Sequence, residues 1–221
     1  MKKDNISDMI ETTYRRANAM VRPLFILMFM IFVSSFHAFA LTAEEVAKKT
    51  AAVVSASKGV SASFTLTSNG RSAKGTVKTS GSKFAVSTPQ VSTWYNGKSL
   101  YTYNPRTNET TVTTPTRQEL MESNPLLYVN AGTGFRYTFN PVKRNGKYVV
   151  DITPVKKNSG ITKLTVTVNS TTFYPEKISV TAGGSTTTVD VTSFKTTAGG
   201  TPAEFEYPKS RYPKAEIVDL R

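Results

Sequence analysis

One stretch decides the fold class of this chain: Trp94-Tyr95-Asn96-Gly97-Lys98-Ser99-Leu100-Tyr101-Thr102-Tyr103-Asn104-Pro105. Two runs of aromatic, β-prone residues flank an Asn-Gly pair. Asn-Gly favours a two-residue type I′ turn, because both residues tolerate positive φ. We therefore expect a tight β-hairpin, in which Tyr95 faces Lys98 and Trp94 faces Ser99 across the turn.

Alternation along the two strands sorts the side chains of this hairpin onto opposite faces. Trp94, Tyr101 and Tyr103 share one face, and Tyr95 shares the other face with Leu100. The pattern leaves open which of the two faces looks inward. A sheet this rich in aromatic residues needs a cover on one face, either from its own core or from an apolar ligand.

Period-two patterns fill most of the remaining sequence. Val60, Ala62, Phe64 and Leu66 alternate with Ser and Thr, as in a half-buried strand. Further runs of this kind give about ten or eleven short strands, with turn signals every 8–12 residues. We therefore expect a mainly β fold with helices (α+β), built on an antiparallel barrel or curled sheet.

Two capping boxes predict the helices. Thr42 is followed three residues later by Glu45, and Thr116 by Glu119. The first helix is expected to stop at Gly59, and the second is short because Asn124-Pro125 ends it. A dense apolar cluster then follows at residues 126–129 and interrupts the β pattern in mid-domain.

The N-terminus has the pattern of a secretory signal. An apolar run at residues 24–33 follows three arginines and precedes Ala38-Phe39-Ala40. We expect cleavage after Ala40, with Met20 as an alternative start and an uncleaved anchor as the alternative reading. Residues 41–221 then form a single exported domain.

Charge and cysteine content narrow the class of partners. Five basic and three acidic residues precede Leu41, which leaves a formal net charge of +11 for the remainder. This charge is either a solvated basic surface or a surface for anionic lipid or acidic partners. The chain has no Cys to carry a lipid anchor, and no recognised nucleic-acid motif. We expect a monomer without nucleic acid.

The types of residue in the chain give little support for an enzyme. The one histidine, His37, lies inside the expected signal, so the exported chain has neither His nor Cys. Ser-His-Asp and Cys-His nucleophilic sites and ordinary zinc sites are therefore excluded. The pairs Gly183-Gly184 and Gly199-Gly200 lack a phosphate-binding pattern and are interpreted as turns. We expect no catalysis, no cofactor and no metal.

The order of these elements resembles a known family. The stretch Trp94–Pro105 resembles the signature DGK-x-L-[aromatic]-x-Y-[ND]-P of the periplasmic outer-membrane lipoprotein carrier, LolA. The resemblance extends over nearly all of residues 42–221. Its other parts are Val60-Ser61-Ala62-Ser63-Phe64, Gly75-Thr76-Val77, Lys83-Phe84, Asn124-Pro125-Leu126-Leu127, Tyr212-Pro213 and Ile217-Val218-Asp219-Leu220-Arg221.

This resemblance implies a half-open antiparallel barrel with a helical lid at residues 115–130. The cavity would hold the acyl chains of a lipoprotein, which passes from an inner-membrane lipoprotein-releasing ABC transporter to an outer-membrane lipoprotein receptor. The candidate lining comes from early strands, the hairpin and the lid: Phe64, Leu66, Phe84, Trp94, Tyr101, Tyr103, Leu120, Met121, Leu126 and Leu127. Each of these residues also has a plain reading as core.

The chain departs from the family at one point. The well-studied carriers have an Arg after the position that resembles Gly75, where it ties the barrel to the lid, and residues 78–83 here contain no Arg. Lys78 and Lys83 are the candidates to replace it. Two other functions stay open: a lipid- or glycolipid-binding or sensor module on the same fold, and a secreted β-rich structural protein that binds no ligand.

Overall fold

A computed structural model describes residues 41–56, 59–130, 134–140, 142, 144–155, 160–196 and 200–221. Residues 41–221 form one compact unit. The expected signal, its cleavage after Ala40 and the alternative start at Met20 lie outside the described residues. No helix in the part of the chain that the structure describes is long and apolar enough to span a membrane.

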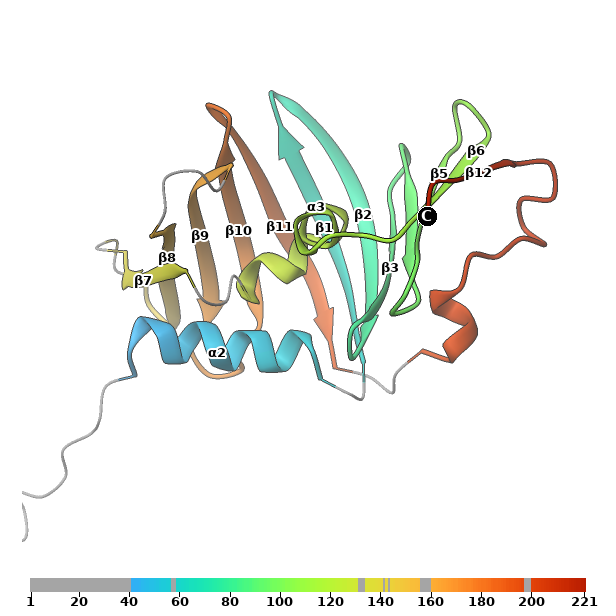
Figure 1. Ribbon diagram of the computed structural model, residues 1–221. Helices are drawn as coiled ribbons and strands as arrows, with labels where there is room; N and C mark the ends of the chain where they lie inside the picture. The colour runs from blue at the N-terminus through green and yellow to red at the C-terminus, as the bar shows by residue number, and fades with distance from the viewer. Residues whose placement is uncertain are drawn as a thin grey trace, which may run out of the picture. The chain divides into compact units, whose positions relative to one another are not determined.

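The unit is built on one curved, open sheet, which has twelve strands among the described residues (Figure 1). The strand order is β12-β6-β5-β4-β3-β2-β1-β11-β10-β9-β8-β7, so β12 and β7 are the two edges. All neighbours pair antiparallel except β12 and β6, which are parallel. The strands are β1 (Val60–Ser68), β2 (Arg71–Ser80), β3 (Lys83–Ser87), β4 (Ser92–Tyr95), β5 (Leu100–Asn104), β6 (Glu109–Thr113), β7 (Phe135–Phe139), β8 (Lys147–Pro154), β9 (Ile161–Asn169), β10 (Pro175–Ala182), β11 (Ser185–Lys195) and β12 (Glu216–Asp219). The expected mainly β fold is confirmed, and the sheet is curved and not closed, as expected for a half-open barrel. The described residues form twelve strands, where ten or eleven were expected.

Both capping boxes form as the sequence predicts. In helix α2 (Ala43–Val54), the Thr42 hydroxyl accepts from the Glu45 amide at 3.2 Å, and the Glu45 carboxylate accepts from the Thr42 amide at 2.7 Å. Helix α3 (Arg117–Ser123) begins with the same pairing of Thr116 and Glu119. A 3₁₀ turn, η1 (Pro125–Asn130), follows α3, and a second, η2 (Pro202–Phe205), comes near the C-terminus. Helix α2 ends at Val54, earlier than the expected stop at Gly59.

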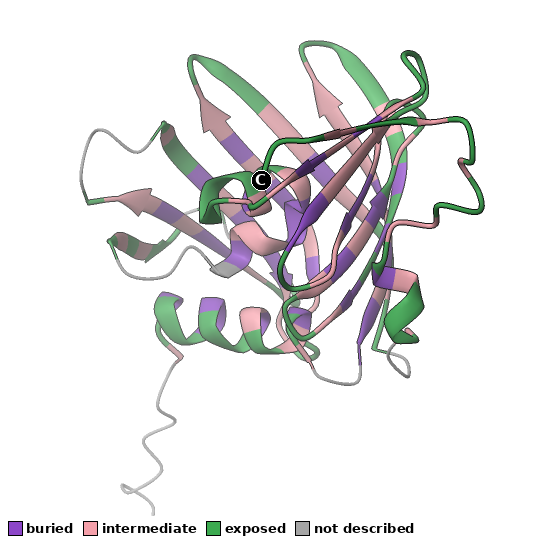
Figure 2. Cartoon of the chain, turned by 45° about the vertical axis from the view of Figure 1, so that its right-hand side comes forward, coloured by how far each residue is buried: buried purple, intermediate pink, exposed green. Residues whose placement is uncertain are grey.

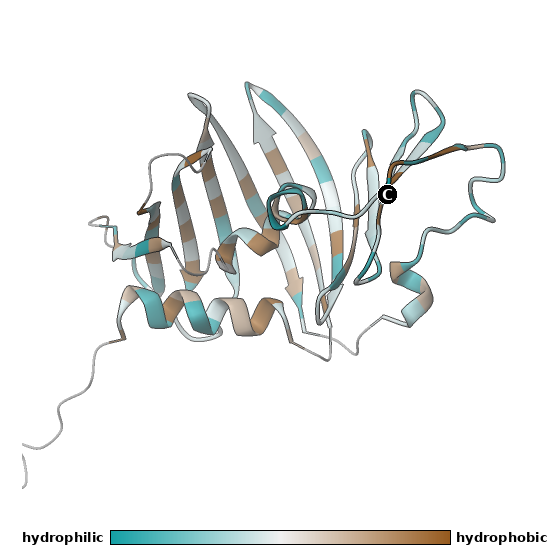
Figure 3. Cartoon of the chain, in the orientation of Figure 1, coloured by the Kyte–Doolittle hydropathy of each residue, from teal (hydrophilic) through white to brown (hydrophobic). Residues whose placement is uncertain are grey.

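One face of the sheet carries the main core. Helix α2, helix α3 and η1 lie in front of this face, which we call the lid face (Figure 1). Val60, Ala62 and Phe64 of β1 point to it and join one buried cluster with Val46 of α2 and Leu126 of η1. Buried and exposed residues alternate along the strands (Figure 2), and apolar bands cross the sheet behind the helices (Figure 3). The period-two pattern in the sequence is the cause, because successive side chains alternate between faces.

The aromatic hairpin forms with a different register from the expected one. Tyr95 pairs with Leu100 and Trp94 with Tyr101, so the connecting loop is four residues long. Within this loop Gly97 has positive φ but Asn96 does not, because the Asn96 side chain accepts from the amides of Lys98 and Ser99 instead. That local cap favours a longer loop over a type I′ turn. Two-residue turns with positive φ at both residues occur at Asn69-Gly70 and Gly183-Gly184.

The sorting of the hairpin into two faces is confirmed, because the register differs by an even number of residues. Tyr95 and Leu100 point to the lid face, where both pack on the core cluster. Trp94, Tyr101 and Tyr103 point to the opposite face, which we call the outer face.

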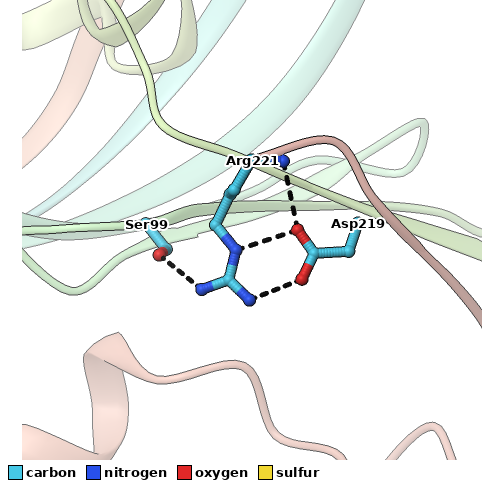
Figure 4. Close-up of polar contacts among 3 residues, drawn as sticks. All are labelled: Ser99, Asp219 and Arg221. Carbon is cyan, nitrogen blue, oxygen red and sulfur yellow. Dashed lines mark hydrogen bonds and ion pairs between the residues drawn. The ribbon is translucent and has the colours of Figure 1, made fainter.

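The chain from residue 200 to 221 runs back along the outer face of β3–β6 (Figure 1) and is called the strap. It begins with η2, where Phe205 is buried, and ends with β12 paired to β6. The Arg221 guanidinium donates to both carboxylate oxygens of Asp219 and to the Ser99 hydroxyl at 3.2 Å (Figure 4). The last residue thereby ties the strap to the loop of the aromatic hairpin.

Candidate functional site

A cavity of about 380 Å³ lies between the lid, formed by α3 and η1, and the lid face of the sheet. The lid supplies Met121 and Tyr128, and β7 supplies Phe135. The opposite wall comes from β9 and β10 through Ile161, Val180 and Ala182. The wall is mostly apolar, so the cavity is suited to an apolar ligand.

The polar residues of the cavity come from the exposed side of α3, with Arg117, Gln118 and Glu122. Gln118 donates to Glu122 at 2.9 Å. Burial of the Tyr128 ring, with a smaller effect from the Glu122 charge, raises the pKa of the Tyr128 hydroxyl above its ordinary value. Tyr128 therefore stays neutral at physiological pH. Polar groups with apolar walls suit an amphiphile with an apolar tail.

The described residues contain no candidate metal site. No group of three or more His, Cys, Asp or Glu side chains lies together there in a way that could hold a metal ion.

The ten residues that the sequence suggested as a lining are distributed over several places. Of these ten, Met121 alone lines the cavity beneath the lid. Phe84 and Leu126 are fully buried core, and Leu120 and Leu127 are partly buried against that core. These four side chains belong to the core or pack against it. A contact between any of them and a ligand stays a prediction.

Two residues of β1 lie on the lid face but outside this cavity. The Phe64 ring is buried over Gly75 on β2, its cross-strand partner. A Cβ at Gly75 would lie within 2.7 Å of two ring atoms, so the glycine makes room for the ring. Leu66 lies two residues further along β1 and lines a separate groove at the ends of the strands.

The sheet separates the three remaining aromatic residues from the lid cavity. Trp94, Tyr101 and Tyr103 point to the outer face, where the strap covers them. Trp94 lies edge-on to Tyr207 at 5.6 Å between centroids, and Tyr103 lies 4.1 Å from Tyr212. These three side chains therefore do not share a space with Met121. The set of ten does not form one lining.

Sequence reasoning missed most of the cavity wall. Tyr128 lies in the apolar cluster that the sequence singled out, and Phe135 lies in an alternating strand. The pairing of Ile161 with Ala182 brings β9 and β10 to the same wall. Alternation marks such residues as inward-facing. It does not say which inward residues border a space and which fill the core.

Among the described residues, neither candidate lysine makes a hydrogen bond or ion pair with the lid. Lys78 points to the outer face and pairs with Glu204 of the strap at 2.5 Å. Its neighbour Thr79 points to the lid face instead, where its hydroxyl donates to the backbone oxygen of Val54 at 3.0 Å. The contact of β2 with α2 is therefore made by a buried threonine, at the end of that helix.

Comparison with known proteins gives the family. The model of the family "Outer membrane lipoprotein carrier protein LolA" matches residues 33–184. No curated protein matches the chain. An uncharacterized conserved protein from Thermus thermophilus has a similar fold, with 14% identity, a TM-score of 0.56, and coverage of 80% of this chain and 98% of that one.

Two further solved structures are more distant. A LolA superfamily protein from Nitrosomonas europaea has 11% identity and a TM-score of 0.42 over 76% of this chain and 99% of that one. A putative outer membrane lipoprotein-sorting protein domain from Vibrio parahaemolyticus has 13% identity and a TM-score of 0.43 over 77% and 97%. The family model matches more than half of this chain, and the chain belongs to the outer membrane lipoprotein carrier protein LolA family.

Proposed function

We propose that this protein is a periplasmic carrier, which binds acyl chains of lipoproteins beneath its lid and takes them from the inner to the outer membrane. The apolar cavity of about 380 Å³ under the lid is the observation that carries the proposal. The role requires binding and release without covalent chemistry, so we propose no enzymatic activity.

The size of the cavity supports a ligand of the acyl-chain class. A methylene group needs about as much room as a water molecule, whose share of the liquid is about 30 Å³. The cavity of about 380 Å³ then holds on the order of a dozen methylene groups. Burial stabilises each of these by about 0.8 kcal/mol, which is enough to keep one chain out of water.

The lid forms one connected piece of the chain. Helix α3 has seven residues, and Asn124 joins it to η1. The Asn124 side-chain oxygen accepts from the Leu126 amide at 3.1 Å, which fixes this junction. Opening at the lid would enlarge the cavity for a cargo with more than one chain.

The volume of the cavity also favours a second candidate function, a carrier or sensor of a single-chain lipid on this fold. Room for about one chain suits such a lipid without any lid movement. Under the first function the donor is an inner-membrane lipoprotein-releasing ABC transporter and the acceptor an outer-membrane lipoprotein receptor. Under the second function neither partner is needed.

Identification of the natural ligand separates these functions. The protein is purified from periplasm without detergent, and its bound molecules are identified by native mass spectrometry and lipid extraction. Acylated lipoprotein supports the first function, and free lipid supports the second. Protein that carries no apolar molecule and binds no fluorescent fatty acid contradicts both.

A matched pair of variants places the ligand. Ala182→Phe puts a ring into the cavity, whereas Ala52→Phe puts the same ring on the exposed side of α2. We expect Ala182→Phe to lower the affinity for a fluorescent fatty acid by about tenfold or more, and Ala52→Phe to leave it unchanged. Equal affinities in folded variants would place the ligand elsewhere.

A further inference from the structure

A second groove, of about 640 Å³, lies where three strand connections meet on the side of the sheet away from β7. These are the β1–β2 turn, the β3–β4 loop and the β5–β6 turn. The groove shares no lining residue with the cavity beneath the lid. It is therefore a separate site.

The floor of this groove includes three aliphatic side chains. Leu66 and Ala73 pair across β1 and β2, and both are partly buried. Val91 comes from the β3–β4 loop, where the Thr88 hydroxyl accepts from its amide at 3.1 Å and donates to its carbonyl at 3.0 Å. The floor thus offers three aliphatic side chains to a ligand.

Two exposed arginines stand beside this floor. Arg71 follows the two-residue turn Asn69-Gly70 directly, and Arg106 lies in the β5–β6 turn, where its amide donates to the Asn104 side chain at 2.9 Å. Neither guanidinium takes part in an ion pair or hydrogen bond in the described part of the chain. The residues that line the groove include no Asp or Glu.

We propose that this groove binds an anionic phospholipid, with its phosphate between Arg71 and Arg106 and its glycerol and first methylenes on Leu66, Ala73 and Val91. Guanidinium groups bind phosphate in a bidentate way and are weakly hydrated, so they give up water readily. The apolar floor adds affinity that a free phosphate ion cannot use. The proposal goes beyond the carrier function, because it needs neither the lid nor the cavity.

The test uses dihexanoyl phosphatidylglycerol below its micelle concentration, titrated into the full-length exported protein and followed by two-dimensional NMR. We expect the largest amide shifts at the three connections, and saturable binding. Glycerol 3-phosphate, titrated in parallel, has the anion without the chains. Its affinity should be lower by about tenfold or more.

Two double variants with equal loss of charge make the result specific. Arg71→Gln with Arg106→Gln removes both guanidinium groups from the groove, and Arg136→Gln with Arg211→Gln removes two exposed ones elsewhere. We expect the first pair to weaken the phospholipid by on the order of tenfold and the second to have little effect. Equal weakening by both pairs, or equal affinity for glycerol 3-phosphate and the lipid, would overturn the proposal.

The outcome is independent of the carrier function. The arginine variants should bind a fluorescent fatty acid normally, and Ala182→Phe should bind the phospholipid normally. Loss of both ligands in Ala182→Phe would show that the groove and the cavity are one site, and would also contradict the proposal.

Discussion

The rings of Tyr101 and Tyr207 stack, with their centroids 5.8 Å apart and their planes 7° from parallel. Tyr101 comes from the hairpin, and Tyr207 comes from the strap, more than a hundred residues later. The Tyr207 hydroxyl also accepts from Thr110 at 3.0 Å. The strap therefore supplies the cover that the aromatic outer face of this hairpin needs.

Removal of this cover should change the fluorescence of the single tryptophan. In the Tyr207→Ala variant, Trp94 loses its edge-on neighbour, and we expect its emission to shift to longer wavelength. The free energy of unfolding should fall by about 1–2 kcal/mol. The matched control is Tyr174→Ala, whose ring packs on Phe194 instead. Unchanged emission in Tyr207→Ala would mean that the strap does not shield Trp94.

The contact of Phe64 with Gly75 should make this glycine sensitive to a single methyl group. Gly75→Ala would place a Cβ 2.4 Å from the Phe64 ring, and we expect a loss of about 1–3 kcal/mol in the free energy of unfolding. In a Phe64→Leu background the same change should cost less, because the ring is gone. Denaturant unfolding of the four proteins measures the coupling. Equal costs in both backgrounds would contradict the contact.

The Lys78–Glu204 ion pair should contribute to the attachment of the strap and should not affect ligand binding beneath the lid. Both side chains are more than a third exposed, so we expect Lys78→Gln to change the free energy of unfolding by less than about 1 kcal/mol. Affinity for a fluorescent fatty acid should be the same as in the wild type, and Glu204→Gln should behave alike. A drop in affinity with Lys78→Gln alone would give Lys78 the role of the missing family arginine.

Acid should release the end of the strap only at very low pH. Hydrogen bonds from the Arg221 guanidinium lower the pKa of Asp219 to about 2. Because the folded-state pKa lies below the ordinary value of 3.8, this carboxylate stabilises the strap above that value and loses its effect as the pH falls toward 2. An NMR titration of the Asp219 carboxyl carbon measures this midpoint, and Ser99→Ala serves as a control that keeps the carboxylate pair. A midpoint near 3.8 would show that the contact with Arg221 is absent in solution.

Local sequence predicted correctly several features that depend on residues close together in the chain. The two capping boxes, the turns at Asn69-Gly70 and Gly183-Gly184, and the sorting of the aromatic hairpin into two faces follow from side-chain chemistry within a few residues. The predicted turn type at Asn96 was wrong because an Asn in a turn has two alternatives. Its backbone can adopt positive φ, or its side chain can accept hydrogen bonds from the amides that follow, as it does here. Both are properties of Asn in turns.

The candidate lining was a weaker prediction, since it depends on which segments meet. The resemblance grouped Met121 with Trp94 and Tyr101 in one expected lining, and of these three Met121 lines the cavity beneath the lid. Their cover comes from the strap, which pairs with β6 from the far end of the chain. Alternation assigns two faces to a strand but not the partner of either face.

By itself, the sequence determined a β-rich fold with two capped helices and an apolar segment in mid-domain, because propensity, capping and alternation act over short distances. The resemblance to the family then implied that this segment is a lid. Only the tertiary structure decided what each surface of the aromatic hairpin touches. Tyr95 and Leu100 face the core, while Trp94, Tyr101 and Tyr103 lie under the strap. It also decided that the cavity lies between the lid, β7, β9 and β10, since contacts between distant segments set where the core leaves space.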